Sequence, residues 1–341
     1  MGKQSNGKPT NLKSYNAPSA SVRKLTLFCL LLLASGVGMT VASEATPPAW
    51  AYPVNPPDFK PSPDDGELKH VPGSSAGYKL SEIRDLFVAP DWHPEDHGPM
   101  PEVVMHGRKP QVYACGCCHR ADGPGGPENS SLAGLPVAYI IQQVADFKSG
   151  ARKTSVPQRG PTQAMTLLST AATDAEVAAA AAYFSALKPK ALIRVVETQT
   201  VPKTYVAGWF LAALKTGETE PIGQRIIEVP EDVEQFERRD THSRFVAHVP
   251  VGSLLRGQAL ADTGVGGKTI QCRICHGPDL KGLGPIPAIA GRSPSYIFRQ
   301  LYDFKAGNRA GIGSALMKPT VANLTPEDML SLAAYTSSLA P

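Results

Sequence analysis

Two C-x-x-C-H strings, 157 positions apart, constrain this chain more than any other feature. The first spans Cys115–His119 and the second spans Cys272–His276. Two thiols at this spacing can form thioethers with the two vinyl groups of one porphyrin, and the adjacent histidine then lies under the iron. We therefore predict two covalently bound haem c groups. The expected attachment residues are Cys115, Cys118, Cys272 and Cys275, and the expected proximal iron ligands are His119 and His276.

The surroundings of the two strings repeat as well. Residues 134–152 align without a gap on residues 291–309, and nine of these 19 positions are identical. The first copy then holds five extra residues, after which a methionine and a tyrosine return to register in both copies. Self-similarity of this kind indicates one structural unit built twice. Because there are only two copies, we expect two domains rather than a solenoid.

The second axial ligand of each iron is predicted to be a methionine. Histidine is absent between His119 and His242 and after His276. Met165 and Met317 stand at matching positions, each 18 residues before a tyrosine of the repeat. A thioether opposite histidine is a common axial pair and raises the reduction potential. The alternative, that both methionines only fill the core, stays open, whereas Met329 aligns with Val177 and is expected in the core.

Other polar residues have weaker assignments. A buried propionate needs a hydrogen-bond donor, so the repeated residues Tyr139, Arg152, Tyr296 and Arg309 are candidate propionate contacts, although helix packing explains them equally well. Cys117 is expected to be an unpaired thiol that points away from the haem, with redox sensing or off-register attachment as alternatives. The spacing of the remaining clustered histidines fits no standard metal site; they are His93, His97 and His106.

The N-terminal residues indicate export. Residues 1–43 contain five basic residues and no acidic one, which leaves 29 basic and 30 acidic residues in the rest of the chain. That balance offers no basic stripe for nucleic acid. The apolar residues 25–42 are typical of a signal peptide but could also anchor the chain in the inner membrane. Both alternatives place the haem domains in the periplasm, either soluble or anchored, with membrane association only through this segment.

The patterns together predict a mainly α fold with a partly β insert. The expected parts are a signal peptide or anchor at 1–43, a proline-rich extension at 44–100, haem domains at 101–189 and 251–341, and an inter-domain insert at 190–250. Residues 44–72 should be an extended tether because they are rich in proline. In the insert we expect two to four short strands, with a helix at 207–215 as the competing assignment. Capping boxes at Thr173 and Thr325 mark the last helix of each domain.

With its paired C-x-x-C-H strings and methionines, the chain resembles the diheme class I cytochromes c, and among them cytochrome c4. The resemblance covers residues 101–189 and 251–341. It implies two all-α cytochrome c domains that face each other and shuttle electrons between periplasmic or membrane-bound redox enzymes. The proline-rich extension and the 190–250 insert depart from that pattern.

The sequence is compatible with three functions. The first is an electron carrier with no substrate of its own. The second is an electron-accepting subunit held by a dehydrogenase or oxidase. The third is a diheme peroxidase, which two methionine-closed irons argue against because peroxide needs an open site. We expect a carrier and not an enzyme, with redox proteins as partners, and we expect the insert to affect partner choice more than redox chemistry.

Overall fold

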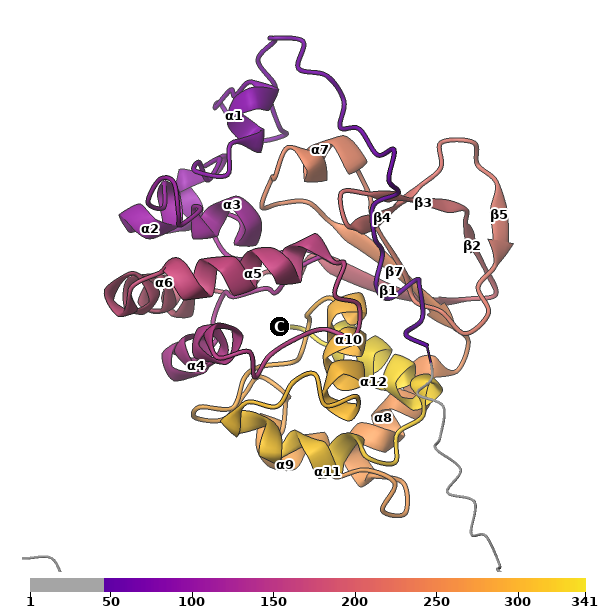
Figure 1. Ribbon diagram of the computed structural model, residues 1–341. Helices are drawn as coiled ribbons and strands as arrows, with labels where there is room; N and C mark the ends of the chain where they lie inside the picture. Colours follow the sequence, from indigo (N-terminus) through magenta and orange to yellow (C-terminus); the bar gives the residue numbers. More distant parts are fainter. Residues whose placement is uncertain (1–45) are drawn as a thin grey trace, which may run out of the picture. The chain divides into compact units, whose positions relative to one another are not determined.

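The structure, a computed structural model, describes residues 46–341, which form one compact unit. The predicted signal peptide or anchor at 1–43 lies outside the described residues. Among the helices of the described part, none combines the length and the apolar character needed to cross a bilayer. The described helices and strands gather into three regions: the first repeat copy, the second copy and the strands between them (Figure 1).

The two copies of the repeat fold into matching helices. The motif helices α3 (Cys115–His119) and α9 (Cys272–His276) are followed by α4 (Val137–Lys148) and α10 (Pro294–Lys305), with bounds offset by the same 157 positions. The last helices, α6 (Asp174–Ala186) and α12 (Pro326–Ser338), both begin with the predicted capping box. The predicted last helix of each domain is therefore confirmed, because its capping box is a local signal that the repeat carries twice.

The copies differ in the elements around the methionines and before the motifs. The first copy has α2 (Glu102–Met105) before its motif and the long α5 (Gly160–Ala171) around Met165. The second copy has the longer α8 (Ser253–Thr263) before its motif. Around Met317 it has only η2 (Ile312–Ala315) and α11 (Met317–Val321). The five extra residues of the first copy therefore lengthen the segment that leads to Met165, the expected axial ligand.

Each copy has its own hydrophobic core. In the second, α12 packs on α8 and α10 around Phe298 and Leu330. Met329 is 1% exposed in this cluster, which confirms the prediction that it is a core residue. In the first, α6 packs on α4 around Ala181 and Phe184, both fully buried. Two separate cores are what a duplicated unit requires, because each copy must bury its own apolar helix faces.

The insert is more sheet-rich than expected. β1 (Ile193–Thr198) runs parallel to β7 (Phe245–Pro250), which pairs antiparallel with β6 (Ile227–Pro230). Two further pairs complete the described strands: β2 (Thr200–Pro202) with β5 (Thr219–Pro221), and β3 (Thr204–Ala207) with β4 (Phe210–Ala213). The expectation of two to four strands was too low, since short strands carry too few residues for period-2 alternation to show. A helix at 207–215 was wrong because this segment forms the second strand of a tight hairpin; the insert's helix is α7 (Val233–Glu237).

The proline-rich extension is only partly a tether. Residues 56–69 are exposed apart from a half-buried Lys69, but Ala51 and Tyr52 are 0% and 3% exposed in the core of the second copy. Tyr52 Oη donates to Asp303 Oδ1 over 2.9 Å, and Arg299 Nη1 donates to the Ala51 carbonyl over 2.9 Å. The expectation of an unpacked tether is therefore wrong for this part. The extension continues through α1 (Leu80–Arg84) and η1 (Pro94–Asp96).

The two copies meet along the segments that follow α4 and α10. Arg152 and Arg309, equivalent residues of the repeat, pair as an antiparallel bridge. Lys153 N donates to the Asn308 carbonyl over 2.6 Å, and Ala310 N donates to the Ala151 carbonyl over 2.7 Å. The repeat thus supplies both sides of its own junction, with approximate two-fold symmetry.

Candidate haem sites

The two motif histidines are oriented in the same way. His119 Nδ1 lies 2.8 Å from the Ser130 carbonyl, and His276 Nδ1 lies 2.7 Å from the Pro287 carbonyl, each eleven residues further along the chain. Because a carbonyl only accepts, Nδ1 carries the proton and Nε2 keeps its lone pair for a metal. Burial lowers the pKa of His119 to about 4 and lowers that of His276 as well, so both rings are neutral near pH 7.

The predicted residues of the first site share one cavity. It has a volume of about 890 Å³ and is lined by Cys115, Cys118, His119 and Met165. Cofactor sites are typically about 300–1,000 Å³. A second cavity of about 120 Å³ adjoins it, shares His119 and Met165, and extends toward the junction between the copies. The thiols, the imidazole and the thioether thus come together from α3 and α5.

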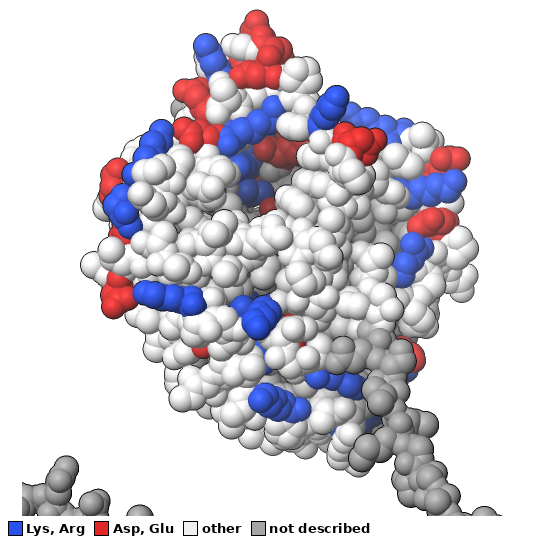
Figure 2. Space-filling view, in the orientation of Figure 1, with Lys and Arg blue, Asp and Glu red and all other residues white. Residues whose placement is uncertain are grey.

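The extension and the insert cover this first cavity. Its wall includes residues of the extension, such as Phe59 and Leu86, and residues of the insert, such as Trp209 and Arg239. These parts belong to neither copy of the repeat. The Arg239 guanidinium donates to the Cys117 carbonyl, and the Arg120 guanidinium lies 4.7 Å from the centre of the Phe236 ring. In the space-filling view a hollow in the upper part of the molecule is bordered by such charged side chains (Figure 2).

The surroundings of the second motif are more exposed. Cys272 and Met317 are both half-buried and pack against the core of the second copy. The apolar residues next to the expected ligands are largely exposed: Ile274 by 63%, Leu283 by 59% and Leu316 by 60%. These side chains offer an apolar surface of the kind that a porphyrin face covers. The surroundings of the two motifs are therefore unequal although the motif geometry is the same.

The four candidate propionate contacts meet at the junction between the copies. Arg152 Nη2 donates to Tyr296 Oη over 2.8 Å, and Arg309 Nη2 lies 3.5 Å from Tyr139 Oη. Both guanidinium groups also donate to Gln143 Oε1, over 2.8 Å and 2.6 Å. Each arginine therefore bonds to a tyrosine of the other copy. This accounts for the identity of the repeated residues by packing between copies.

The same junction has excess positive charge on its inner side. The smaller cavity is lined by two carboxylates, those of Glu128 and Asp303, and by four cationic side chains: Arg152, Lys153, Arg159 and Arg299. Within the described residues, Arg152 and Arg309 form no ion pair with a carboxylate. Buried guanidinium groups without an anion are costly. The acidic propionates of a haem fit this site.

The chain is similar in sequence to several c-type cytochromes. The chain is 27% identical to the thiosulfate dehydrogenase electron acceptor of Thiomonas intermedia over 231 residues, covering 66% of this chain and 78% of that protein. It is 26% identical to cytochrome c4 of Azotobacter vinelandii over 235 residues, covering 67% and 86%. Cytochrome c-554(548) of Halomonas halodenitrificans is 41% identical over 68 residues, covering 20% of this chain and 82% of that protein. The chain belongs to the diheme c-type cytochromes.

No protein-family model matches the chain. Among solved structures, the thiosulfate dehydrogenase TsdBA of Marichromatium purpuratum aligns with a TM-score of 0.47 and 25% identity over 76% of this chain, which spans 40% of that structure.

The sequence relatives confirm the predicted resemblance to cytochrome c4. They also confirm the mainly α diheme fold, the two covalent haem c groups and the role as an electron carrier rather than an enzyme.

The first motif of this diheme cytochrome also contains a third cysteine, Cys117. Cys117 is unpaired and fully buried, and its Sγ lies 3.5 Å from Cys118 Sγ. It contributes to the wall of the larger cavity. The Arg239 side chain hydrogen-bonds to its thiol. The orientation of Cys117 away from the haem stays a prediction.

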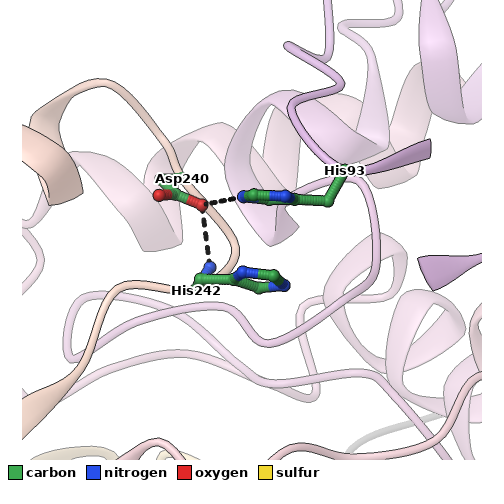
Figure 3. Close-up of side chains that lie close together, drawn as sticks. All are labelled: His93, Asp240 and His242. Carbon is green, nitrogen blue, oxygen red and sulfur yellow. Dashed lines mark hydrogen bonds and ion pairs between the residues drawn. The ribbon is translucent and has the colours of Figure 1, made fainter. Parts of the chain in front are cut away.

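A histidine and aspartate cluster lies away from the haem cavities. His93 of the extension and His242 of the insert stack with their ring centres 3.6 Å apart and their planes at 13° (Figure 3). Asp240 Oδ1 accepts from the His93 ring over 3.0 Å and from the His242 backbone N–H over 2.9 Å. A metal ion lies in the plane of each imidazole that binds it, so two stacked rings cannot both aim at one ion. In this arrangement the cluster joins extension to insert by hydrogen bonds.

Sequence reasoning missed several residues around the first site. Gln143 and Gln300 are identical in the repeat, and that identity was a signal for their role at the junction. Arg159 and Trp209, in contrast, belong to parts with no counterpart in the second copy, and nothing in the sequence marked them. They reach the cavity only through the tertiary fold.

Proposed function

We propose that this diheme cytochrome holds each iron between a histidine and a methionine, His119 with Met165 and His276 with Met317. The main support is the first cavity, where both cysteines, His119 and Met165 line one volume although they come from separate helices. For the second site the support is the repeat and the packing of Cys272 and Met317 against one core. When bound, haem supplies one-electron storage; the chain fixes the ligands, covers the iron and excludes water.

An iron whose two axial positions are both occupied by protein side chains can pass on electrons but cannot bind a substrate. With two such irons, the protein would be an electron carrier. His119 and His276 are held by backbone carbonyls, so neither ring can turn away without losing a hydrogen bond. If methionine occupies the opposite position, peroxide and carbon monoxide have no place to bind. Junction contacts from Tyr139, Arg152, Tyr296 and Arg309 would then bind propionates and hold the two haem groups in one rigid unit for exchange of electrons between them.

The experiment is to mix the reduced and half-reduced holoprotein with carbon monoxide and with hydrogen peroxide at neutral pH. We expect no stoichiometric carbon monoxide spectrum and no rapid peroxide turnover. Stoichiometric binding of carbon monoxide at either haem would show an open site and would return the peroxidase alternative. The visible spectrum of the oxidised protein, with its weak methionine-to-iron band near the red end, gives an independent check of the ligands.

We further infer that the carrier works in the periplasm and receives electrons from a dehydrogenase. The support is its similarity to proteins named as thiosulfate dehydrogenase electron acceptors, from Thiomonas intermedia and Stutzerimonas stutzeri. The test is to mix a purified thiosulfate dehydrogenase, thiosulfate and the oxidised holoprotein, and to follow haem reduction. We expect reduction only when enzyme and thiosulfate are both present. Absence of reduction would exclude this donor while leaving the carrier function intact.

A further inference from the structure

The helix that carries Met165 begins beside an unusual arginine. Arg159 directly precedes α5, is only 2% exposed, and lines the smaller cavity together with His119 and Met165. Its Nη2 donates to the Trp209 carbonyl over 3.2 Å, whereas its buried Nε has no hydrogen-bond partner among the described residues. A buried cation with an unused donor at a cofactor cavity indicates a missing anionic acceptor.

Trp209 of the insert accepts this hydrogen bond from Arg159. Its own backbone has an unfavourable conformation. Ala207 pairs with Phe210, so the β3–β4 loop consists of Gly208 and Trp209, with φ values of 56° and 79°. Such loops favour glycine and asparagine, and a bulky residue at positive φ is an outlier. Strain of this kind persists only where surrounding contacts fix the backbone. Here Trp209 N donates to Asn55 Oδ1 of the extension over 3.2 Å.

The indole also touches the first residue of α5. A Cβ atom placed on Gly160 would lie 2.7 Å from Cζ2 of Trp209, so only glycine permits this contact. The indole therefore packs directly on the backbone at the start of the helix that carries Met165. In this way the insert contacts the ligand helix through its backbone and contacts Arg159 through a hydrogen bond.

The second copy lacks all of these features. The five extra residues of the first copy lie between Arg152 and Met165, and Arg159 falls within this lengthened segment. The corresponding segment of the second copy, residues 310–316, contains no cationic side chain. Ser155 and Val156 of the extra stretch contact Asp303 and the core of the second copy, which anchors the segment in place. The positive charge is thus specific to the first haem site.

We propose that Arg159 binds a propionate of the first haem, and that the insert, through Trp209, holds it there to raise the potential of that haem relative to the second. This rests on the proposed ligation of the first iron by His119 and Met165. A fixed positive charge favours the reduced iron, which carries one positive charge less, and the effect is strong where water is excluded. The role differs from the expectation that the insert acts on partner choice more than on redox chemistry.

The electrostatics of the site agree with an anion there. Burial lowers the pKa of Arg159 to about 9, and the neighbouring Arg299 contributes to the decrease. Two guanidinium groups that line one buried cavity disfavour each other unless an anion offsets their charge. Two carboxylates line the same cavity, but Glu128 already pairs with Arg120 over 3.4 Å, and Asp303 already accepts hydrogen bonds from Tyr52 and Ser155. A propionate would supply the further negative charge.

The test is a spectroelectrochemical titration of the full holoprotein and its variants. We expect Arg159→Gln to lower the potential of one haem and leave the other unchanged. A tenfold change in the reduction equilibrium, equal to 59 mV for one electron, is the expected size. Arg159→Lys keeps the charge and should recover most of the lost potential. Met165→His identifies which wave belongs to the first haem, and Arg194→Gln, an exposed arginine of the insert, is the matched control.

Trp209→Asn tests the positioning role separately. Asparagine tolerates positive φ, so the hairpin can persist while the indole is lost. We expect a shift of the same sign as for Arg159→Gln, but smaller. If Arg159→Gln retains both methionine-to-iron bands and moves neither potential, the inference is wrong although the proposed ligation stands. If Arg159→Gln shifts the potential and Trp209→Asn does not, the insert has no positioning role. Absence of the methionine-to-iron band from the spectrum of the unaltered protein would instead contradict the proposed ligation.

Discussion

Single residues decide the iron chemistry of this cytochrome. The backbone carbonyls of Ser130 and Pro287 fix the tautomer of the two proximal histidines, a role that any residue type could fill at those positions. The proposed methionine ligands, in contrast, each have to supply a sulfur atom. Met165 reaches its cavity from the middle of a helix, whereas Met317 is the first residue of one. The same axial pair is therefore expected to have different stiffness in the two copies.

Replacement of either methionine by histidine should change one haem only. We expect Met165→His and Met317→His each to lower the potential of the haem in the same copy, because an imidazole replaces a softer thioether. Redox titration followed by optical spectroscopy measures the change. Met329→Leu is the control: Met329 is 1% exposed in the core, and the swap should leave both potentials unaltered at a cost below about 1.5 kcal/mol of stability. A potential shift in Met329→Leu would show that the repeat alignment is wrong.

At the scale of elements, each copy depends on how its last helix begins. Thr173 and Thr325 accept a hydrogen bond from the backbone N–H three residues further on, and the carboxylates of Glu176 and Asp328 accept one from the threonine backbone N–H. These boxes join α6 and α12 to the rest of each domain through ion pairs with Arg108 and with Arg256 and Lys268. The helix start is thus tied to tertiary structure in both copies.

Loss of the second cap should be measurable. Thr325→Ala removes the acceptor for the Asp328 N–H at 3.2 Å and should lower the free energy of unfolding by about 1 kcal/mol. Denaturant unfolding followed by circular dichroism is the measurement. Thr263→Ala is a suitable comparison, because that exposed threonine lies at the end of α8 and caps no helix start. Equal stability of Thr325→Ala and the unaltered protein would show that this cap does not contribute to the free energy of unfolding.

The first cap should make stability depend on acid pH. The Arg108 guanidinium lowers the pKa of Glu176 to about 2 in the folded protein, against about 4.3 in an unfolded chain. A depressed folded pKa stabilises the protein fully above the unfolded value, and the contribution is lost as the pH falls from about 4.3 toward 2. Glu176→Gln should therefore flatten the pH dependence of stability in this window. Glu218→Gln, at an exposed site in the insert, should leave the profile unchanged.

At the scale of the whole molecule, the junction between the copies is approximate in its symmetry. The Arg152 to Tyr296 contact is 2.8 Å, whereas the Arg309 to Tyr139 contact is 3.5 Å. Arg292 adds three further bonds across the junction, from one side only, to Ser131 and Ala133. Together with the insert and the extension, these contacts join two similar domains into one unequal molecule.

The unequal contacts lead to an unequal response to mutation. Tyr296→Phe removes the acceptor of a short, partly buried hydrogen bond from a charged donor and should cost about 1.5–3 kcal/mol of unfolding free energy. Tyr139→Phe removes only the long contact and should cost clearly less. Urea unfolding of both variants under identical conditions decides between them. A larger loss for Tyr139→Phe would mean that the junction is not arranged as described.

Sequence by itself determined the chemistry of the protein and its repeated elements. Covalent haem needs its thiols and histidine within five consecutive residues, and helix caps act within one turn, so both can be read locally. The junction, the docking of Tyr52 and the cover over the first cavity were decided only by the tertiary structure. Each joins residues more than a hundred positions apart, such as Asn55 with Trp209. No local pattern encodes such a contact, because it forms only when separately folded parts pack together.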